Sequence, residues 1–287
     1  MIKIESVDIS SEALSRISDL IRKSEQLAHL VNEISSTSYR NFGNDAFMYD
    51  RKNGDDFFPD PACSSLKLQK FYTLGAGGLL FSAAHLAENA VAEKGTYHPY
   101  TPLSAGVVCR SVLEYACAAS FILGESNMSD KVAKMYALVR KGFTDYSWNT
   151  SARSHQFYVN IVEWGKGKQL PNKKFIPSKV AKNIVSIDAD PYGYLSEISH
   201  GNAVTLNASI ISAQENLGFN EQFDYWALAI AYEAVFNLAA LYTKIFPSTW
   251  EKNLNIHKKY VQVLRSSELI NWGPSKPIPD HDNIFDA

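Results

Sequence analysis

The chain has 287 residues, of which 46% are hydrophobic and 20% are charged, and its formal net charge is −2. This composition is typical of a globular protein with a sizeable core, and it excludes wholesale disorder. So small a net charge provides no global field that would attract nucleic acid or an anionic membrane. Binding of either would need a local basic patch.

Cysteine usage and the apolar pattern predict a soluble, cytoplasmic protein. Cys63, Cys109 and Cys117 are odd in number and include no Cys-x-x-Cys pair, which favours reduced thiols. The first ten residues lack the basic and apolar regions of a signal peptide. Charged residues interrupt every apolar stretch before it reaches the roughly 18 residues of a membrane span. We therefore expect no membrane association.

The N-terminal part of the chain predicts one long helix followed by a long loop. Apolar residues recur three and four positions apart from Ser11 to about Tyr39, which is typical of an amphipathic helix. Residues 41–65 are dense in Gly, Asn, Asp and Pro, and this composition predicts an ordered loop. Loops of that length inside compact domains are often functional.

Four further helices are predicted next along the chain, over about 65–93, 101–123, 129–148 and 154–165. The first of them contains GAGGLL, from Gly75 to Leu80. No strand precedes this stretch and no Gly-Lys-Ser/Thr follows it, so a phosphate-binding loop is not indicated. The small residues instead predict a close approach between two helices.

The C-terminal half begins with a basic connection, GKGKQLPNKKFIPSK, and continues as helices. The predicted elements are a short helix carrying YGYLSEISHGN, an apolar segment at 203–213, helices at 221–246 and 249–267, and a proline-rich tail at 268–287. No stretch alternates convincingly as a strand does. The sequence predicts a single all-α domain over 1–287. It would be a helical bundle of about seven to nine helices with a long N-terminal helix, a motif-bearing core at about 66–213, C-terminal helices at 221–267 and an extended tail.

Two charges stand out in the apolar helix predicted at 101–123. Between Leu103 and Leu123 only Arg110 and Glu114 are charged, and their spacing places them on one face. Because the helix is apolar on its other sides, both should be largely buried and paired. Two interpretations stay open. The pair is a structural ion pair, or it forms a polar site in which Arg110 binds an anion and Glu114 orients it or carries a proton.

The stretch YGYLSEISHGN, residues 192–202, provides a third candidate. In a helix, Ser196 and His200 share a face, with Tyr192 above them. A histidine there could titrate near neutrality and serve as an acid or a base, or it could be a structural histidine with satisfied hydrogen bonds. Tyr192, Ser196 and Glu197 are the candidate binding residues around it.

A metal site is a separate alternative. Glu197-x-x-His200 matches the Glu-x-x-His unit of di-iron helical bundles, and other helices carry Glu114 and Glu233. Such sites need two Glu-x-x-His units. This sequence has a single one, because His85-x-x-Glu88 has the reverse order. We therefore predict no metal ligands and no cofactor, and keep a metal-dependent, di-iron-like oxidase as an alternative.

The two motifs together resemble an uncharacterised family of helical bacterial proteins. Its members pair Arg-x-x-x-Glu in a buried helix with a later Tyr-x-x-Leu-Ser-x-x-x-His-Gly. The matching positions here are Arg110, Glu114, Tyr192, Leu195, Ser196, His200 and Gly201. The resemblance covers about 66–213. That family is distantly similar to HEPN helical domains, many of which are metal-independent RNases in toxin and antiviral systems.

The resemblance implies a catalytic site of Arg110, Glu114 and His200 that acts on or binds a phosphate-bearing ligand. RNA or a nucleotide would be the partner, in a toxin or defence system, and the protein would form a homo-oligomer. Arg110 and His200 belong to different segments, so they would have to meet in space. The arginine would then stabilise charge on the phosphorane while the histidine moves a proton. The alternative is a non-catalytic interaction module whose Arg–Glu–His cluster is structural.

Overall fold

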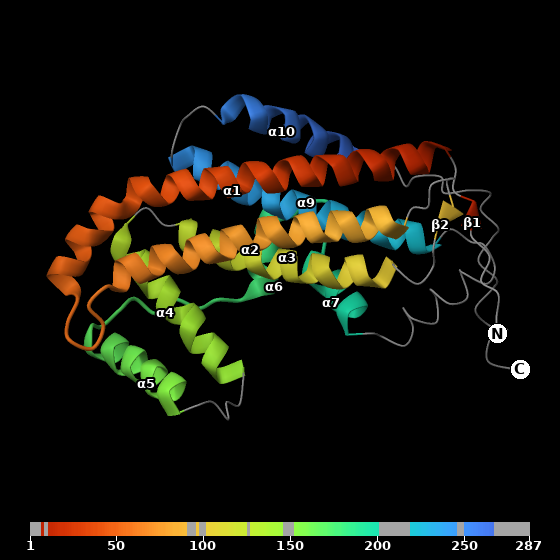
Figure 1. Ribbon diagram of the computed structural model, residues 1–287. Helices are drawn as coiled ribbons and strands as arrows, with labels where there is room; N and C mark the ends of the chain where they lie inside the picture. The colour runs from red at the N-terminus through yellow and green to blue at the C-terminus, as the bar shows by residue number, and fades with distance from the viewer. Residues whose placement is uncertain are drawn as a thin grey trace, which may run out of the picture.

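The chain folds into packed α-helices with a two-residue strand pair at one end (Figure 1). The structure is a computed structural model that describes residues 7–8, 11–90, 96–97, 102–124, 127–145, 152–200, 219–245 and 250–266. The predicted all-α class is confirmed. The expected number of about seven to nine helices is inexact, because the helices are numbered to α10. The segment predicted at 203–213 and the tail at 268–287 lie outside the described residues.

The first two helices form an antiparallel pair (Figure 1). α1 spans Ser11–Asn53, 43 residues, and α2 spans Pro61–Ala90. The loop predicted at 41–65 is therefore wrong, since only residues 54–60 connect the two helices. The Gly and Asn residues in this stretch favour a loop, but burial stabilises the helix instead. Ala46 and Asp50, one turn apart, extend the buried face of α1.

The remaining described helices are α3 (Pro102–Leu123), α4 (Met128–Asp145), α5 (Ala152–Gly167), α6 (Pro177–Ile184), α7 (Pro191–Ser199), α9 (Phe219–Ile245) and α10 (Glu251–Ser266). Six of them agree with their predicted ranges to within about one helical turn, and α6 is the exception, because no helix was predicted over its residues. β1 (Val7–Asp8) and β2 (Thr96–Tyr97) pair antiparallel, with Val7 opposite Tyr97. Two residues are too few to show alternation, so the sequence pattern did not predict these strands.

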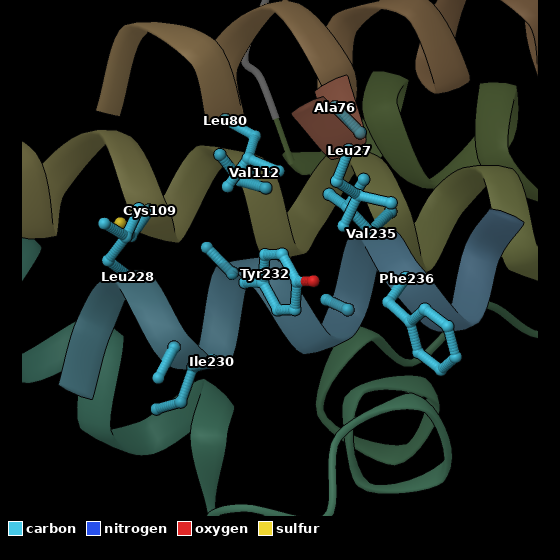
Figure 2. Packing of buried hydrophobic residues seen from close by; sticks show 14 of the residues in the cluster. Leu27, Ala76, Leu80, Cys109, Val112, Leu228, Ile230, Tyr232, Val235 and Phe236 are labelled. Carbon is cyan, nitrogen blue, oxygen red and sulfur yellow. The ribbon is translucent and has the colours of Figure 1, made fainter. Parts of the chain in front are cut away.

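The largest hydrophobic core surrounds α9, which α1, α2 and α3 contact along its length. Figure 2 shows Leu27 of α1, Leu80 of α2 and Val112 of α3 gathered around the α9 residues Tyr232 and Val235. All five side chains are almost completely buried. Each such burial removes apolar surface from water and contributes about 1.5–3 kcal/mol, so this cluster is the main source of stability.

Parts of α3 and α9 are long and apolar enough to cross a membrane. These parts are Ala105–Leu123 and Tyr225–Thr243, of 19 residues each. About two thirds or more of each part, 67% and 72%, is buried inside the protein. The buried core helices of water-soluble proteins have the same composition, so the two helices are weak evidence for membrane spans.

The glycines of GAGGLL allow the close helix approach that the sequence predicts. A Cβ at Gly75 would collide with the ring of Tyr115 on α3. A Cβ at Gly77 would lie 2.8 Å from the side-chain oxygen of Asn32 on α1. Gly78 faces open space. The close approach is therefore confirmed at two of the three glycines, which bring α2 against α1 and α3.

A second, smaller core lies where α1 turns into α2, and an aspartate of α1 joins the two helices there. The cluster is formed by Ala46, Phe58, Ala62, Leu66, Val132, Met135 and Trp164. Within it, the buried Asp50 carboxylate accepts hydrogen bonds from the backbone N–H groups of Ala62, at 2.6 Å, and Cys63, at 3.0 Å. These groups belong to the first turn of α2, where N–H groups have no partner within their own helix. Asp50 thus caps α2 from a different helix.

We expect Asp50→Ala to lower the free energy of unfolding by about 1–3 kcal/mol, because two buried N–H groups would lose their acceptor. Urea unfolding followed by circular dichroism measures this loss. Asp45→Ala, at an exposed position of the same helix, should change the free energy of unfolding by less than about 0.5 kcal/mol. Equal effects of the two substitutions would contradict the capping role.

A buried histidine joins α9 to α10. His257 is 5% exposed, and its Nδ1 lies 2.7 Å from the hydroxyl of Tyr232. Burial, followed by the charge of Lys23, lowers the pKa of His257 to about 4. Burial also raises the pKa of Tyr232. Near pH 7 the phenol and the imidazole are therefore both neutral, and a hydrogen bond joins the hydroxyl to Nδ1, with its direction set by the imidazole tautomer.

The pH dependence of stability follows from this histidine. The folded protein keeps His257 neutral down to about pH 4, whereas the unfolded chain takes up the proton below about pH 6.5. The stabilisation is thus fully present above about pH 6.5. It is lost as the pH falls toward 4, by up to about 1.4 kcal/mol per pH unit. Urea unfolding of wild type and His257→Gln across this range should show a flatter dependence in the variant. His29→Gln, at an exposed position, should keep the wild-type dependence.

Candidate functional site

The site predicted from the sequence lies where α7 packs against α3 (Figure 1). The two helices approach closely at Gly106, where a Cβ would lie 2.7 Å from Cγ2 of Ile198. α7 begins with Pro191 at its first turn, and its first backbone hydrogen bond runs from Tyr194 N–H to Asp190 C=O at 3.0 Å. These contacts hold the first turn of α7, which contains Tyr192, beside the middle of α3.

Arg110, Glu114 and Tyr192 are brought together as predicted. The guanidinium carbon of Arg110 lies 3.5 Å from the centroid of the Tyr192 ring, which is the geometry of a cation–π contact. Nη2 of Arg110 forms an ion pair with Oε1 of Glu114 at 3.0 Å. The Tyr192 hydroxyl donates a longer hydrogen bond, 3.4 Å, to the same oxygen. The three side chains therefore close a ring of contacts between α3 and α7.

Arg110 is more deeply buried than its partners, and part of its guanidinium is unpaired. The residue is 8% exposed. Its Nε and Nη1 atoms are inaccessible to solvent and have no hydrogen-bond partner among the described residues. Buried N–H groups without an acceptor cost about 1–3 kcal/mol each, and more where the group is charged. The described residues supply no acceptor for these two nitrogens.

Glu114 is less buried than predicted. Its side chain is 47% exposed, so the expectation that both charges lie largely inside holds for Arg110 and is wrong for Glu114. The reason is that α3 is not enclosed on all sides. Val107 is 43% exposed, and Ser111 is only partly buried, so Val107, Ser111 and Glu114 form a stripe that reaches the surface. The ion pair thus spans from the interior to solvent.

The rest of the predicted site is more dispersed. Ser196 donates from its Oγ to the carbonyl of Tyr192 at 2.7 Å, which is a bond within α7. Glu197 is exposed. His200 is exposed at the C-terminal end of α7, where its backbone N–H binds Ser196 C=O at 2.9 Å. In the described part of the chain no hydrogen bond or ion pair joins the His200 ring to Arg110 or Glu114. Gly201 lies outside that part.

Cys117 lies one turn beyond Glu114 on α3 and is not a reactive thiol. Burial raises the pKa of Cys117, an effect that the charge of Arg110 only partly opposes. The protonated thiol contacts the carbonyl of Pro177 at 3.7 Å. Cysteine nucleophiles require a thiolate, so this residue contributes packing rather than chemistry.

The carboxylates considered for a di-metal site do not converge. Glu233 is completely buried on α9, and its oxygens accept hydrogen bonds from Ser186 N–H at 2.9 Å, Ser186 Oγ at 2.8 Å and Ile187 N–H at 2.9 Å. Nε and Nη2 of Arg265, on α10, bind the same carboxylate. The Glu233 carboxylate therefore uses all of its hydrogen-bond acceptor capacity to join α9, α10 and the segment after α6.

Sequence reasoning used Glu233 only as a candidate metal ligand and missed this structural role. The sequence feature that could have revealed this role is the one used for Arg110, a charged residue inside an apolar helix.

The lysines of the basic connection are mostly engaged with carboxylates. Lys166 pairs with Glu163 at 2.8 Å and Lys173 with Asp130 at 3.0 Å. Lys168 pairs with Asp55 at 3.1 Å, and Lys182, beyond the connection in α6, pairs with Asp190 at 3.8 Å. Such pairing reduces the positive field of the segment, which favours a solvated connection over a nucleic-acid-binding stripe.

Comparisons with protein-family models, curated proteins and solved structures found no match for this chain. The resemblance to an uncharacterised bacterial family and to HEPN domains therefore stays a prediction, and the function must be argued from the residues of the site.

The contact at Gly106 yields a test of how α7 is held. Gly106→Ala should lower the free energy of unfolding by about 1–3 kcal/mol, because the added methyl group must displace Ile198 and with it α7. Gly78→Ala is the matched control within a helix, since its Cβ would meet no atom within 4 Å. It should raise the free energy of unfolding by about 0.5–1 kcal/mol. Urea unfolding of both variants measures these changes, and stabilisation by Gly106→Ala would contradict the close packing.

Proposed function

We propose that the protein binds a phosphate-bearing ligand, RNA or a nucleotide, at Arg110. The observation that carries this proposal is the buried guanidinium whose Nε and Nη1 have no hydrogen-bond partner in the part of the chain that the structure describes. Phosphate oxygens accept several hydrogen bonds and carry negative charge, so they satisfy both needs of such a group. A neutral acceptor would satisfy only the hydrogen bonds.

The neighbours of Arg110 support binding at this position. The Tyr192 ring lies against the guanidinium and holds its plane, which reduces the freedom lost when a ligand binds. Glu114 binds only Nη2 and extends to solvent, so within the described residues Nε and Nη1 still need an acceptor, and Glu114 marks the outer end of the site. Within this proposal Glu114 orients the arginine, and Tyr192 positions it.

RNA cleavage is the sharper form of the same proposal. Arg110 would stabilise the charge that develops on the phosphorane, His200 would move a proton, and the RNA 2′-OH would be the nucleophile. This form requires the exposed His200 to reach the ligand from the end of α7. The three cysteines are free, which fits the reducing cytoplasm that we propose as its setting. Self-association stays a prediction.

Replacement of Arg110 tests the binding proposal. We expect Arg110→Met to weaken binding of a fluorescein-labelled single-stranded RNA oligonucleotide by about tenfold or more, because hydrogen bonds to a charged group contribute about 1.5–3 kcal/mol. Fluorescence anisotropy at fixed salt measures the affinity. Arg22→Met is the matched control, since Arg22 also forms an intrahelical ion pair, with Asp19 at 2.5 Å, but is exposed. Unchanged affinity in Arg110→Met would refute the proposal.

The stability of the same variant separates a ligand site from a structural ion pair. If the pair only holds the fold, removing Arg110 should cost about 3–5 kcal/mol, as breaking a buried pair does. The proposal predicts a loss below about 1 kcal/mol, because Glu114 can be hydrated and two unpaired donors disappear.

Incubating the RNA with wild type, Arg110→Met and His200→Gln in excess EDTA tests cleavage. Cleavage by wild type alone supports the RNase form, and binding without cleavage restricts the function to binding.

A further inference from the structure

Three potential metal ligands from two helices meet on the outer face of the α1–α2 pair, away from Arg110. The Nε2 atom of His85 lies 3.7 Å from Oε1 of Glu25, and its Nδ1 lies 3.2 Å from Oε2 of Glu88. One ligand atom from each residue can be chosen so that all three lie within 4.8 Å of one another. In the described part of the chain this is the group of His, Cys, Asp and Glu side chains that could hold a metal ion.

The charges of this cluster are unbalanced. Two carboxylates share one imidazole, and across the described residues no lysine or arginine forms an ion pair with Glu25 or Glu88. The other exposed carboxylates in ion pairs of α1, Glu12 and Asp19, each have an arginine partner. Two carboxylates that no lysine or arginine of the described residues neutralises favour a bound cation.

The helix packing fixes the position of the imidazole. The ring of His85 makes an edge contact with Phe81, one turn earlier on α2, with centroids 4.5 Å apart. The register of α1 against α2 is set nearby, where Gly77 approaches the backbone carbonyl of Ala28 and the side chain of Asn32. Because the helices are antiparallel, the same register places Glu25 beside His85. A slip of one turn would separate the two.

We propose that Glu25, His85 and Glu88 bind a divalent first-row transition metal ion, with Zn²⁺ as the natural probe. One imidazole nitrogen and two carboxylate oxygens form a mixed set that suits Zn²⁺, Mn²⁺ and Fe²⁺, and not the all-oxygen set that Ca²⁺ or Mg²⁺ prefers. Metal–ligand bonds of about 2.0–2.2 Å require the three atoms to close to about 3–3.5 Å. Side-chain rotation allows this, because the three side chains are 31%, 47% and 60% exposed.

The site has one structural consequence. Its ligands come from both α1 and α2, so an ion bound there joins the two helices that enclose one side of the core. Water molecules would complete the coordination, since no fourth side chain belongs to the cluster. Binding would compete with protons for His85, so the affinity should fall at acidic pH. The inference does not depend on the function proposed for Arg110.

Titration of the tag-free protein with Zn²⁺ tests the proposal. Isothermal titration calorimetry should show one equivalent bound, with affinity reduced about tenfold or more in Glu25→Gln, His85→Gln and Glu88→Gln. At free Zn²⁺ about 100-fold above Kd, the melting temperature should rise by about 4 °C in wild type and not in these variants. Absorption bands of bound Co²⁺ should show the same dependence on the three residues.

Glu33→Gln is the matched control, because it removes an exposed carboxylate from the same helix outside the cluster. Its Zn²⁺ affinity should stay within about twofold of wild type, and circular dichroism establishes that each variant is folded. Three outcomes would overturn the proposal: no Zn²⁺ binding, an equal loss in Glu33→Gln, or a loss in His85→Gln that neither glutamate variant shares. The last would indicate an isolated surface histidine.

Discussion

Two helices, α3 and α9, are apolar over most of their circumference, and enclosing them is the constraint on which the rest of the structure depends. α9 lies against α1, α2 and α3, while α3 is covered by α2, α9, α6 and α7. The enclosing helices need only one apolar stripe each, and α1 and α10 accordingly keep polar outer faces. Glycines at the contacts of α2 with α1 and α3, and of α3 with α7, bring the backbones close enough to leave little space between them.

A charge placed on an enclosed helix must find its partners within the protein or outside it, and the two such charges differ in this respect. Glu233 on α9 receives backbone and side-chain donors from the segment after α6, together with Arg265 of α10. The Glu233 carboxylate therefore acts as a structural link and has no acceptor capacity left for a ligand. Arg110 on α3 receives one carboxylate and one aromatic ring, and two of its nitrogens find no acceptor among the residues that the structure describes. This difference in hydrogen bonding makes Arg110, and not Glu233, the residue suited to bind a ligand.

Much of the helical layout could be predicted from the sequence, because periodic apolar residues report directly which face of a helix is buried. The predictions failed where a distant segment decides the local structure. Residues 41–53 have the composition of a loop, yet Ala46 and Asp50 extend α1, because they meet Phe58, Ala62 and the first turn of α2. Glu114 was expected inside, yet no neighbouring helix covers the stripe of α3 on which it lies. The sequence of a single helix contains no pattern that would predict either fact, because both depend on contacts with other segments.

The sequence by itself determined the all-α class, the order of the helices apart from α6, and the pairing of Arg110 with Glu114, since an i,i+4 spacing in an apolar helix places both on one face. It also singled out Tyr192, although not its stacking on the guanidinium. Only the tertiary structure decided which charges are satisfied, which side chains reach solvent, and that Glu25 and His85, far apart in the chain, lie within 4 Å. These properties depend on how helices pack side by side, and the periodicity of a single helix does not specify its neighbours.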